Sequence, residues 1–125
     1  MTENFQLFNI GNNPRVELHD RLGLTGCEAS VNCLPAGAAV PFVHKHTHNE
    51  ELYGVISGRG EIWIDGQVSE IKTGDWFRVS PKAKRAIRAG DEPLIFICVQ
   101  AKEGSLEGFT MSDAVICEDK APWME

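Results

Sequence analysis

The sequence predicts an all-β domain, a sandwich or barrel made of short antiparallel strands. Short apolar or alternating stretches recur along the chain between turn signals rich in Gly, Asp, Asn and Pro, which punctuate strands. No helical period of ten residues competes with this rhythm before the C-terminal segment. With 125 residues, the chain fits one domain that can bury a core without disulfides, so residues 1–125 are taken as a single domain.

The alternating stretches define the expected strands in order. Asp65-Gly66 separates two of them and predicts a two-residue hairpin, because a type I′ turn needs positive φ at both central residues. The core barrel is expected over about residues 28–100. Residues 104–125, where the periodicity weakens, are expected to form a short arm, either a last strand with an irregular piece over the barrel mouth or a contact with a partner subunit. The expected strands are residues 28–34, 40–46, 51–56, 61–64, 68–71, 76–79, 86–89 and 94–99.

Composition narrows the function classes. Twelve basic and eighteen acidic residues give a net charge of −6, which repels polyanions and anionic lipid, so nucleic acid and membrane are not expected partners. No apolar run approaches eighteen residues and no basic leader precedes one, which predicts a soluble, cytoplasmic protein. The four cysteines show no CxxC spacing and are expected to be reduced, mostly buried thiols, with Cys98 on a strand that could pass near the site described next.

Three histidines and two carboxylates gather in the segment PFVHKHTHNEELYG. His44 and His46, two apart on a strand, project to the same side about 7 Å apart, so both imidazoles can converge on one ion. Glu51 follows a turn and would face the histidine pair from the returning strand, sharing its face with Tyr53 and Val55. Two histidines and one carboxylate form a three-point metal site that leaves coordination positions open.

This stretch resembles the first motif of the cupins, in which HxH, three or four residues, a Glu, six residues and a Gly follow one another. Here the motif reads His44, Lys45, His46, four residues, Glu51, six residues, Gly58. The resemblance implies a jelly-roll β-barrel of two antiparallel sheets that holds one divalent transition metal. The histidine and carboxylate donors suit Fe, Mn, Ni and Zn alike, so the metal's identity stays open.

The second cupin motif is matched only in part. Gly74, Asp75 and Pro81 correspond to its GD opening and its proline turn, but Arg85 stands where the family has a fourth histidine ligand, with Lys84 the alternative if the register slips by one. A guanidinium stays protonated and cannot bind a metal. Arg85 is therefore interpreted as a substrate anchor for a carboxylate or phosphate, the alternative being a rim residue paired with an acidic neighbour.

Further alternatives concern the coordination positions that the three residues leave open on the metal, and the residue that could act as a general base. Water could fill those positions, His48 could swing in as an additional ligand, or the barrel could have lost its metal. Glu50 and Tyr53, or an unliganded His48, are candidates for a general base.

Two functions from different classes stay open. The first is a metal-dependent enzyme, an oxidoreductase or isomerase that acts on a small anionic molecule as a dioxygenase, isomerase or decarboxylase. The second is a non-catalytic barrel that binds a small ligand. A metal-free structural barrel is a third, weaker interpretation, because it gives the histidines and Glu51 no chemical purpose.

A homodimer is expected as well, because small barrels leave sheet edges and apolar faces exposed. The C-terminal arm, with Phe109, Met111 and Trp123, is a candidate contributor to that contact.

Overall fold

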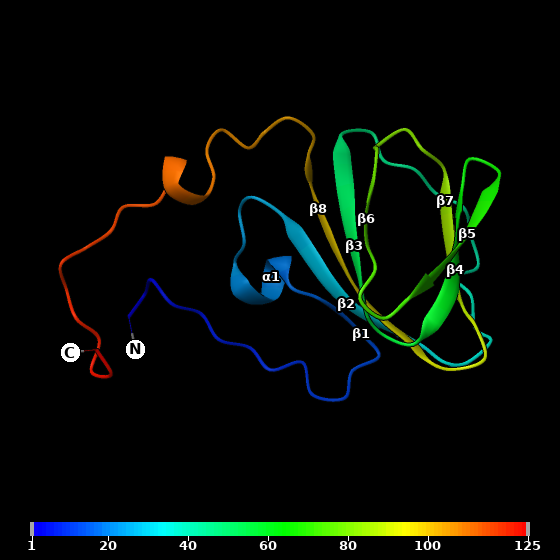
Figure 1. The fold of residues 1–125 in the computed structure, drawn as a ribbon, viewed down its shortest axis with the longest axis horizontal. Coiled ribbons are helices and arrows are strands. Elements are labelled where there is room, and N and C mark those ends of the chain that lie inside the picture. The colour runs from blue at the N-terminus through cyan, green and yellow to red at the C-terminus, as the bar shows by residue number, and fades with distance from the viewer. Residues whose placement is uncertain (1, 125) are drawn as a thin grey trace.

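Two antiparallel sheets pack face to face in the computed structural model, which describes residues 2–124 (Figure 1). Their inner faces meet over a shared core, as the predicted jelly-roll type requires. A one-turn helix, α1 (His19–Leu22), follows the first strand, and a 3₁₀ turn, η1 (Thr110–Ser112), lies in the C-terminal segment. The five-stranded sheet has the order β1 (Arg15–Glu17), β2 (Glu28–Leu34), β8 (Leu94–Lys102), β3 (Asn49–Ser57) and β6 (Trp76–Val79), and the three-stranded sheet has the order β5 (Gln67–Lys72), β4 (Arg59–Ile64) and β7 (Arg85–Ala89).

Most of the predicted strands are present with bounds that shift by up to three residues, but the strand predicted over residues 40–46 is wrong. That segment bends at Pro41 and Phe42, and this part of the chain joins β7 only through isolated bridges at Ala39–Arg88 and His44–Arg85. Pro41 has no backbone N–H to donate, which interrupts a continuous ladder. The short elements β1 and α1 were not predicted.

The predicted hairpin between β4 and β5 is confirmed. Ile64 pairs with Gln67, and the two residues between them, Asp65 and Gly66, have φ values of 48° and 93°. Positive φ at both central positions is the signature of the type I′ turn. The Asp65 side chain also accepts a hydrogen bond of 2.8 Å from the backbone of Lys84, which ties the hairpin to the start of β7.

The core lies between the inner faces of the two sheets. Tyr53 and Val55 of β3 and Phe96 of β8 pack there against Ile62 of β4 and Ile87 of β7. β-branched and aromatic side chains suit this pleated, buried surface, which explains why these stretches form strands. The inner face of β2 is different, because its buried residues Ser30 and Asn32 are polar and line a cavity.

The terminal segments do not cover the barrel. Residues 104–124 run out beyond the five-stranded sheet, on the same side as the N-terminal segment (Figure 1). The expected C-terminal arm is therefore irregular apart from η1. Within residues 2–124, no helix has the length and apolar character needed to span a membrane.

Candidate metal centre

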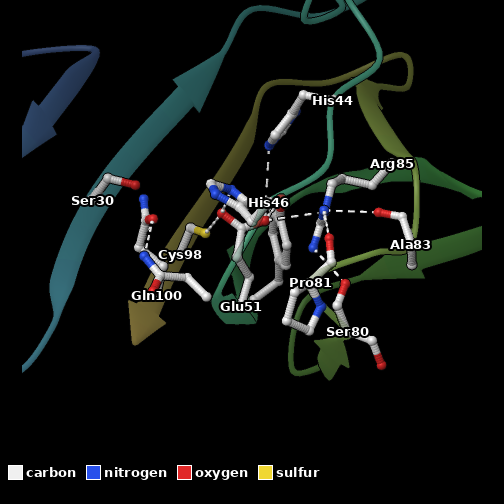
Figure 2. Close-up of polar contacts among 12 residues, drawn as sticks. Ser30, His44, His46, Glu51, Ser80, Pro81, Ala83, Arg85, Cys98 and Gln100 are labelled. Atoms are coloured by element: carbon white, nitrogen blue, oxygen red, sulfur yellow. Dashed lines mark hydrogen bonds and ion pairs between the residues drawn. The ribbon is translucent and has the colours of Figure 1, made fainter. Parts of the chain in front are cut away.

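His44, His46 and Glu51 come together inside the barrel (Figure 2). One donor atom from each of the three residues lies within 4.8 Å of the other two. His44 Nε2 is 3.9 Å from Glu51 Oε1, and His46 Nε2 is 3.1 Å from Glu51 Oε2. The three side chains therefore form the compact N, N, O set that the sequence predicted.

Backbone hydrogen bonds hold the histidine segment although it is not a regular strand. His44 N donates to Arg85 O over 3.1 Å, Arg85 N donates to His44 O over 2.9 Å, and His46 N donates to Pro81 O over 2.8 Å. Glu51 comes from β3, where its backbone pairs with Val79 on one side and Gln100 on the other. The cluster thus joins a segment that pairs with the edge of β7 to a residue of β3.

Four side chains surround the Glu51 carboxylate, which is almost fully buried. Tyr53 donates its hydroxyl to Oε1 over 2.8 Å, and the Cys98 thiol donates to Oε2 over 3.3 Å. Arg85 Nε lies 3.2 Å from Oε1, and His46 contacts Oε2. Both oxygens of the Glu51 carboxylate are therefore held in place by neighbouring side chains.

The structure places Arg85 away from the rim but pairs it with an acidic neighbour, Glu51, as one interpretation expected. Its side chain is 1% exposed, so it is not a rim residue. Its guanidinium donates to the backbone carbonyls of Ala83 at 2.8 Å, Ser80 at 3.0 Å and Pro81 at 3.2 Å, while Nε faces Glu51 (Figure 2). Both terminal nitrogens donate to the 80–83 turn, and Nε lies in an ion pair with Glu51 without a hydrogen bond to it, so the protein's own groups occupy the guanidinium. Arg85 neutralises Glu51 and fastens the turn.

His44 has the protonation behaviour that a metal ligand needs. Burial lowers the pKa of His44 below its ordinary value, the Glu51 carboxylate opposes this in part, and the charge of Arg85 adds to it. A neutral imidazole is the metal-binding form, so protons compete less with a cation at His44. Two imidazoles and a carboxylate that converge from three directions fit a divalent transition metal.

Glu50 and His48, by contrast, are not brought to the cluster. Glu50 lies on the opposite face of β3 from Glu51, and its carboxylate accepts a 2.6 Å hydrogen bond from Arg78 on the outside of the barrel. His48 is exposed in the turn before β3. The expectation that Glu50 could act as a base in the pocket is therefore wrong, because alternate residues of a strand point to opposite faces and Glu50 points outward. Tyr53 is the predicted candidate that does reach the site.

Cys98 belongs to the site although the sequence only hinted at it. It faces Tyr53 directly across the β3–β8 ladder, and that pairing could not be derived from a residue 47 positions away from Glu51 in the chain. Burial, followed by the negative charge of Glu51, raises the pKa of the Cys98 thiol to about 12. The thiol is therefore a hydrogen-bond donor to the carboxylate at neutral pH.

In this environment the Cys98 thiol should not react with alkylating reagents. Iodoacetamide at about pH 8 is expected to alkylate the exposed Cys117 in the native protein and to leave Cys98 unmodified, because only the thiolate reacts. Peptide mass mapping measures both sites, and unfolding the protein in urea should make them react equally. Modification of native Cys98 at the rate of Cys117 would contradict the assigned environment.

A cavity of about 540 Å³ adjoins the cluster. Its polar wall comes from β1, β2 and β8, and it includes Arg15, which donates to the Asn32 side chain and pairs with Glu17. Its apolar wall comes from the 39–44 segment, β7 and β8. The residues that line these walls include Arg15, Ser30, Asn32, Gln100, Val40, Phe42, Ile87 and Phe96.

Comparisons with known proteins agree with this architecture. Residues 30–100 match the cupin domain model. A cupin protein from Bacteroides fragilis is 54% identical, with a TM-score of 0.90 over 93% of this chain and 99% of the other. A protein from Thermotoga maritima, described as a predicted oxalate decarboxylase, is 27% identical, with a TM-score of 0.54 over 61% of this chain and 64% of that one.

A curated relative adds a sequence match without a function. An uncharacterized protein of Methanocaldococcus jannaschii is 35% identical over 66 residues, which are 52% of this chain and 52% of the relative. The chain thus spans about half the length of the curated relative that it matches.

Proposed function

Because this chain belongs to the cupin family, we propose that it binds one divalent transition metal through His44, His46 and Glu51 and acts on a small anionic molecule in the adjoining cavity. The observation that carries the proposal is the group of three donor atoms, all within 4.8 Å of one another, at the wall of a cavity of about 540 Å³. A pocket of this size takes a small molecule, and metal ligands at its wall place chemistry beside it.

A bound metal would supply Lewis-acid polarisation of a substrate oxygen, or a redox centre if the ion is iron or manganese. The chain's own residues prepare the site for that ion. Tyr53 and Cys98 orient the Glu51 carboxylate, and burial raises the pKa of Tyr53 well above its ordinary value, so its hydroxyl keeps its proton. We therefore assign Tyr53 as a positioning residue that holds a metal ligand, rather than as a general base.

Arg15 replaces Arg85 as the anchor that we propose for an anion. It lines the cavity from β1, its side chain is more than half exposed, and its contacts with Asn32 and Glu17 leave donors that can turn toward a ligand. The cavity's other walls are partly apolar, so a carboxylate or phosphate with a short apolar portion fits best. The description of the Thermotoga relative, which names a decarboxylase of a small dicarboxylate, supports an anionic substrate.

A ligand-binding barrel without turnover is the second candidate. One observation favours it: among the described residues that line the cavity, Tyr53 and Cys98 hold their protons and the two histidines and Glu51 are assigned to the metal. No uncommitted base of ordinary pKa then stands beside the ligand.

Metal analysis tests the proposal. Protein purified without a histidine tag or chelator is expected to carry about one equivalent of a transition metal, because three protein ligands suffice for a site with open positions. The double variant His44→Ala, His46→Ala should carry none, while His48→Ala, the matched control, should keep it. A wild-type protein that takes up no Fe, Mn, Ni or Zn even on reconstitution would overturn the metal assignment.

Turnover separates the two candidates once metal is bound. Each metal form is incubated with small carboxylic acids and with sugar phosphates, and substrate loss is followed by mass spectrometry. Consumption of an acid identifies an enzyme, and saturable binding of that acid without consumption identifies the binding barrel. Replacement of Arg15 by Gln should weaken either behaviour without changing metal content.

A further inference from the structure

Hydrogen bonds between β1 and β2 fix which way the polar side chains of the cavity wall face. The Arg15 guanidinium can only donate, so the atom that it contacts on Asn32 is the amide oxygen. The amide nitrogen of Asn32 then faces the other way and donates to Ser30 Oγ over 3.0 Å. Ser30 therefore accepts a hydrogen bond at its oxygen, and the hydrogen of its own hydroxyl stays available.

The Ser30 hydroxyl donates to no other group in the part of the chain that the structure describes, although the residue is only 6% exposed. Buried hydroxyl groups normally use their hydrogen, because an unused buried donor costs free energy. Ser30 lines the cavity beside the metal cluster. An acceptor for this hydrogen can therefore come from a molecule in the cavity.

Ser30 lies beside the proposed metal site. It pairs with Cys98 between β2 and β8, and directly paired residues have Cβ atoms about 5 Å apart on the same face. The Cys98 thiol in turn contacts the Glu51 carboxylate. Figure 2 shows Ser30 and Gln100 on one side of Glu51, with Arg85 on the other. A ligand group that Ser30 holds would thus lie close to the candidate metal ligands.

The polar side chains of this wall, all of which the structure describes, offer donors, and their acceptor oxygens are already in use. Asn32 Oδ1 accepts from Arg15, and Ser30 Oγ accepts from Asn32. Gln100 Oε1 accepts from Asn49 over 2.9 Å, which leaves the amide nitrogen of Gln100 as a further donor. A ligand that bonds to this wall must therefore bring acceptor oxygens, whereas an ammonium group would face other donors.

The spacing of the donors limits the size of the ligand. Arg15 pairs with Asn32, which is two residues from Ser30 on β2, so the two donors lie on rows about 7 Å apart. An extended chain gains about 3.6 Å for every three bonds, so acceptor oxygens at the two rows are joined by about six bonds, as in a dicarboxylate of about five carbons.

We propose that the ligand is a small dicarboxylate without an ammonium group, a narrowing that rests on the function proposed above. Arg15 holds one carboxylate, and Ser30 donates its free hydrogen to the other and so determines specificity. The carbon chain between them lies against the apolar wall that includes Val40, Ile87 and Phe96. Amino acids of the same length are rejected, because their ammonium group would be left without an acceptor.

Calorimetric titration of the full chain with three probes tests this proposal. Glutarate has two carboxylates, 4-aminobutyrate has an ammonium group in place of one of them, and butyrate has no second polar group. Glutarate is expected to bind at least about 10-fold more tightly than butyrate, because it adds a hydrogen bond to a charged group. The ammonium compound should bind more weakly than either.

Variants of Ser30 assign the preference to its hydroxyl. Ser30→Ala should lower the affinity for glutarate about 10-fold and leave the affinity for butyrate unchanged. Ser30→Thr keeps a hydroxyl and should restore glutarate binding. Ser69→Ala is the matched control, because it removes an exposed hydroxyl from β5, outside the cavity, and should change neither affinity. Circular dichroism and metal content should stay as in the wild type in all three variants.

Three results would overturn the proposal. The first is 4-aminobutyrate that binds as tightly as glutarate, and the second is glutarate binding that survives Ser30→Ala unchanged. The third is a wild type that binds none of succinate, glutarate and adipate more tightly than butyrate.

The metal-free double variant His44→Ala, His46→Ala separates this proposal from the metal assignment. The preference for glutarate, and its dependence on Ser30, should persist there, because the donors of the wall do not belong to the metal cluster. A preference that holds in a protein that takes up no metal would support the dicarboxylate and overturn only the metal assignment. Metal uptake without the preference would overturn only the dicarboxylate.

Discussion

Replacing Arg85 with methionine is expected to lower the free energy of unfolding by about 3–5 kcal/mol, the usual cost of breaking a buried ion pair by removing one partner. The variant leaves the Glu51 carboxylate without its nearest cation, and it leaves the carbonyls of Ser80, Pro81 and Ala83 without the guanidinium that they now bind. Methionine fills much of the volume, so the loss reports the polar contacts rather than an empty space.

Urea unfolding at neutral pH measures this loss, and Arg88→Met is its control. Arg88 lies three residues further along the same strand and pairs with Glu61, but its side chain is 65% exposed, so its removal should cost no more than about 1 kcal/mol. Equal losses in the two variants would mean that the Arg85 cluster is no more than a surface ion pair. A larger loss from Arg85 supports its role as the fixed charge that sets the Glu51 carboxylate in place.

Arg85 also bears on how tightly the proposed site would hold an ion. A guanidinium 3.2 Å from Glu51 already neutralises the only carboxylate of the cluster, so a divalent ion bound there would add its charge beside a cation. Coulomb repulsion at this range weakens cation binding relative to a site with a neutral fourth ligand. Arg85, which departs from the family pattern, would therefore influence both the stability of the fold and the affinity of the proposed metal site.

The sequence predicted the candidate metal cluster because its members are close in the chain. His44, His46 and Glu51 lie within eight residues, and strand parity alone separates Glu51 from Glu50. The role of Arg85 could not be predicted in this way. Arg85 does line the cavity, as its place in the second motif implied. The three carbonyls of the 80–83 turn that bind its guanidinium, however, depend on the conformation of that turn, which the alternation of residues does not reveal.

The same distinction holds for the fold. Alternation predicted the strands wherever one face is buried, as in β3 and β6. It failed at residues 40–46, where Pro41 removes a ladder donor, and at β1, whose three residues are too few to show a period. The strand of Cys98 was expected to pass near the site, but its contact with Glu51 could not be predicted, because that contact depends on the register of β3 against β8.

Gly58, the last residue of the first cupin motif, is expected to be as sensitive as Arg85 for a reason unrelated to metal. Gly58→Ala should cost at least about 3 kcal/mol, because φ is +98° there and an added Cβ would lie 2.0 Å from the backbone oxygen of Pro93. A positive φ alone costs an L-residue about 1–2 kcal/mol, and a clash with backbone cannot be relieved by a side-chain rotation.

Gly66→Ala separates these two contributions. Gly66 has nearly the same φ, +93°, but nothing lies within 4 Å of the Cβ that alanine would add, so its loss should be about 1–2 kcal/mol by urea unfolding. Equal losses at the two positions would mean that the positive φ alone explains why the motif has a glycine.

A larger loss at Gly58 would mean that the motif also needs a residue without a side chain at this corner, where the chain passes from β3 in one sheet to β4 in the other. There Gly58 N donates to Thr73 Oγ1 over 3.0 Å, and the approach of Pro93 leaves no room for a side chain. If so, the spacing from Glu51 to Gly58 has two separate causes. Glu51, near the start of β3, belongs to the proposed metal site, and Gly58, just after the end of β3, allows the chain to cross to the other sheet.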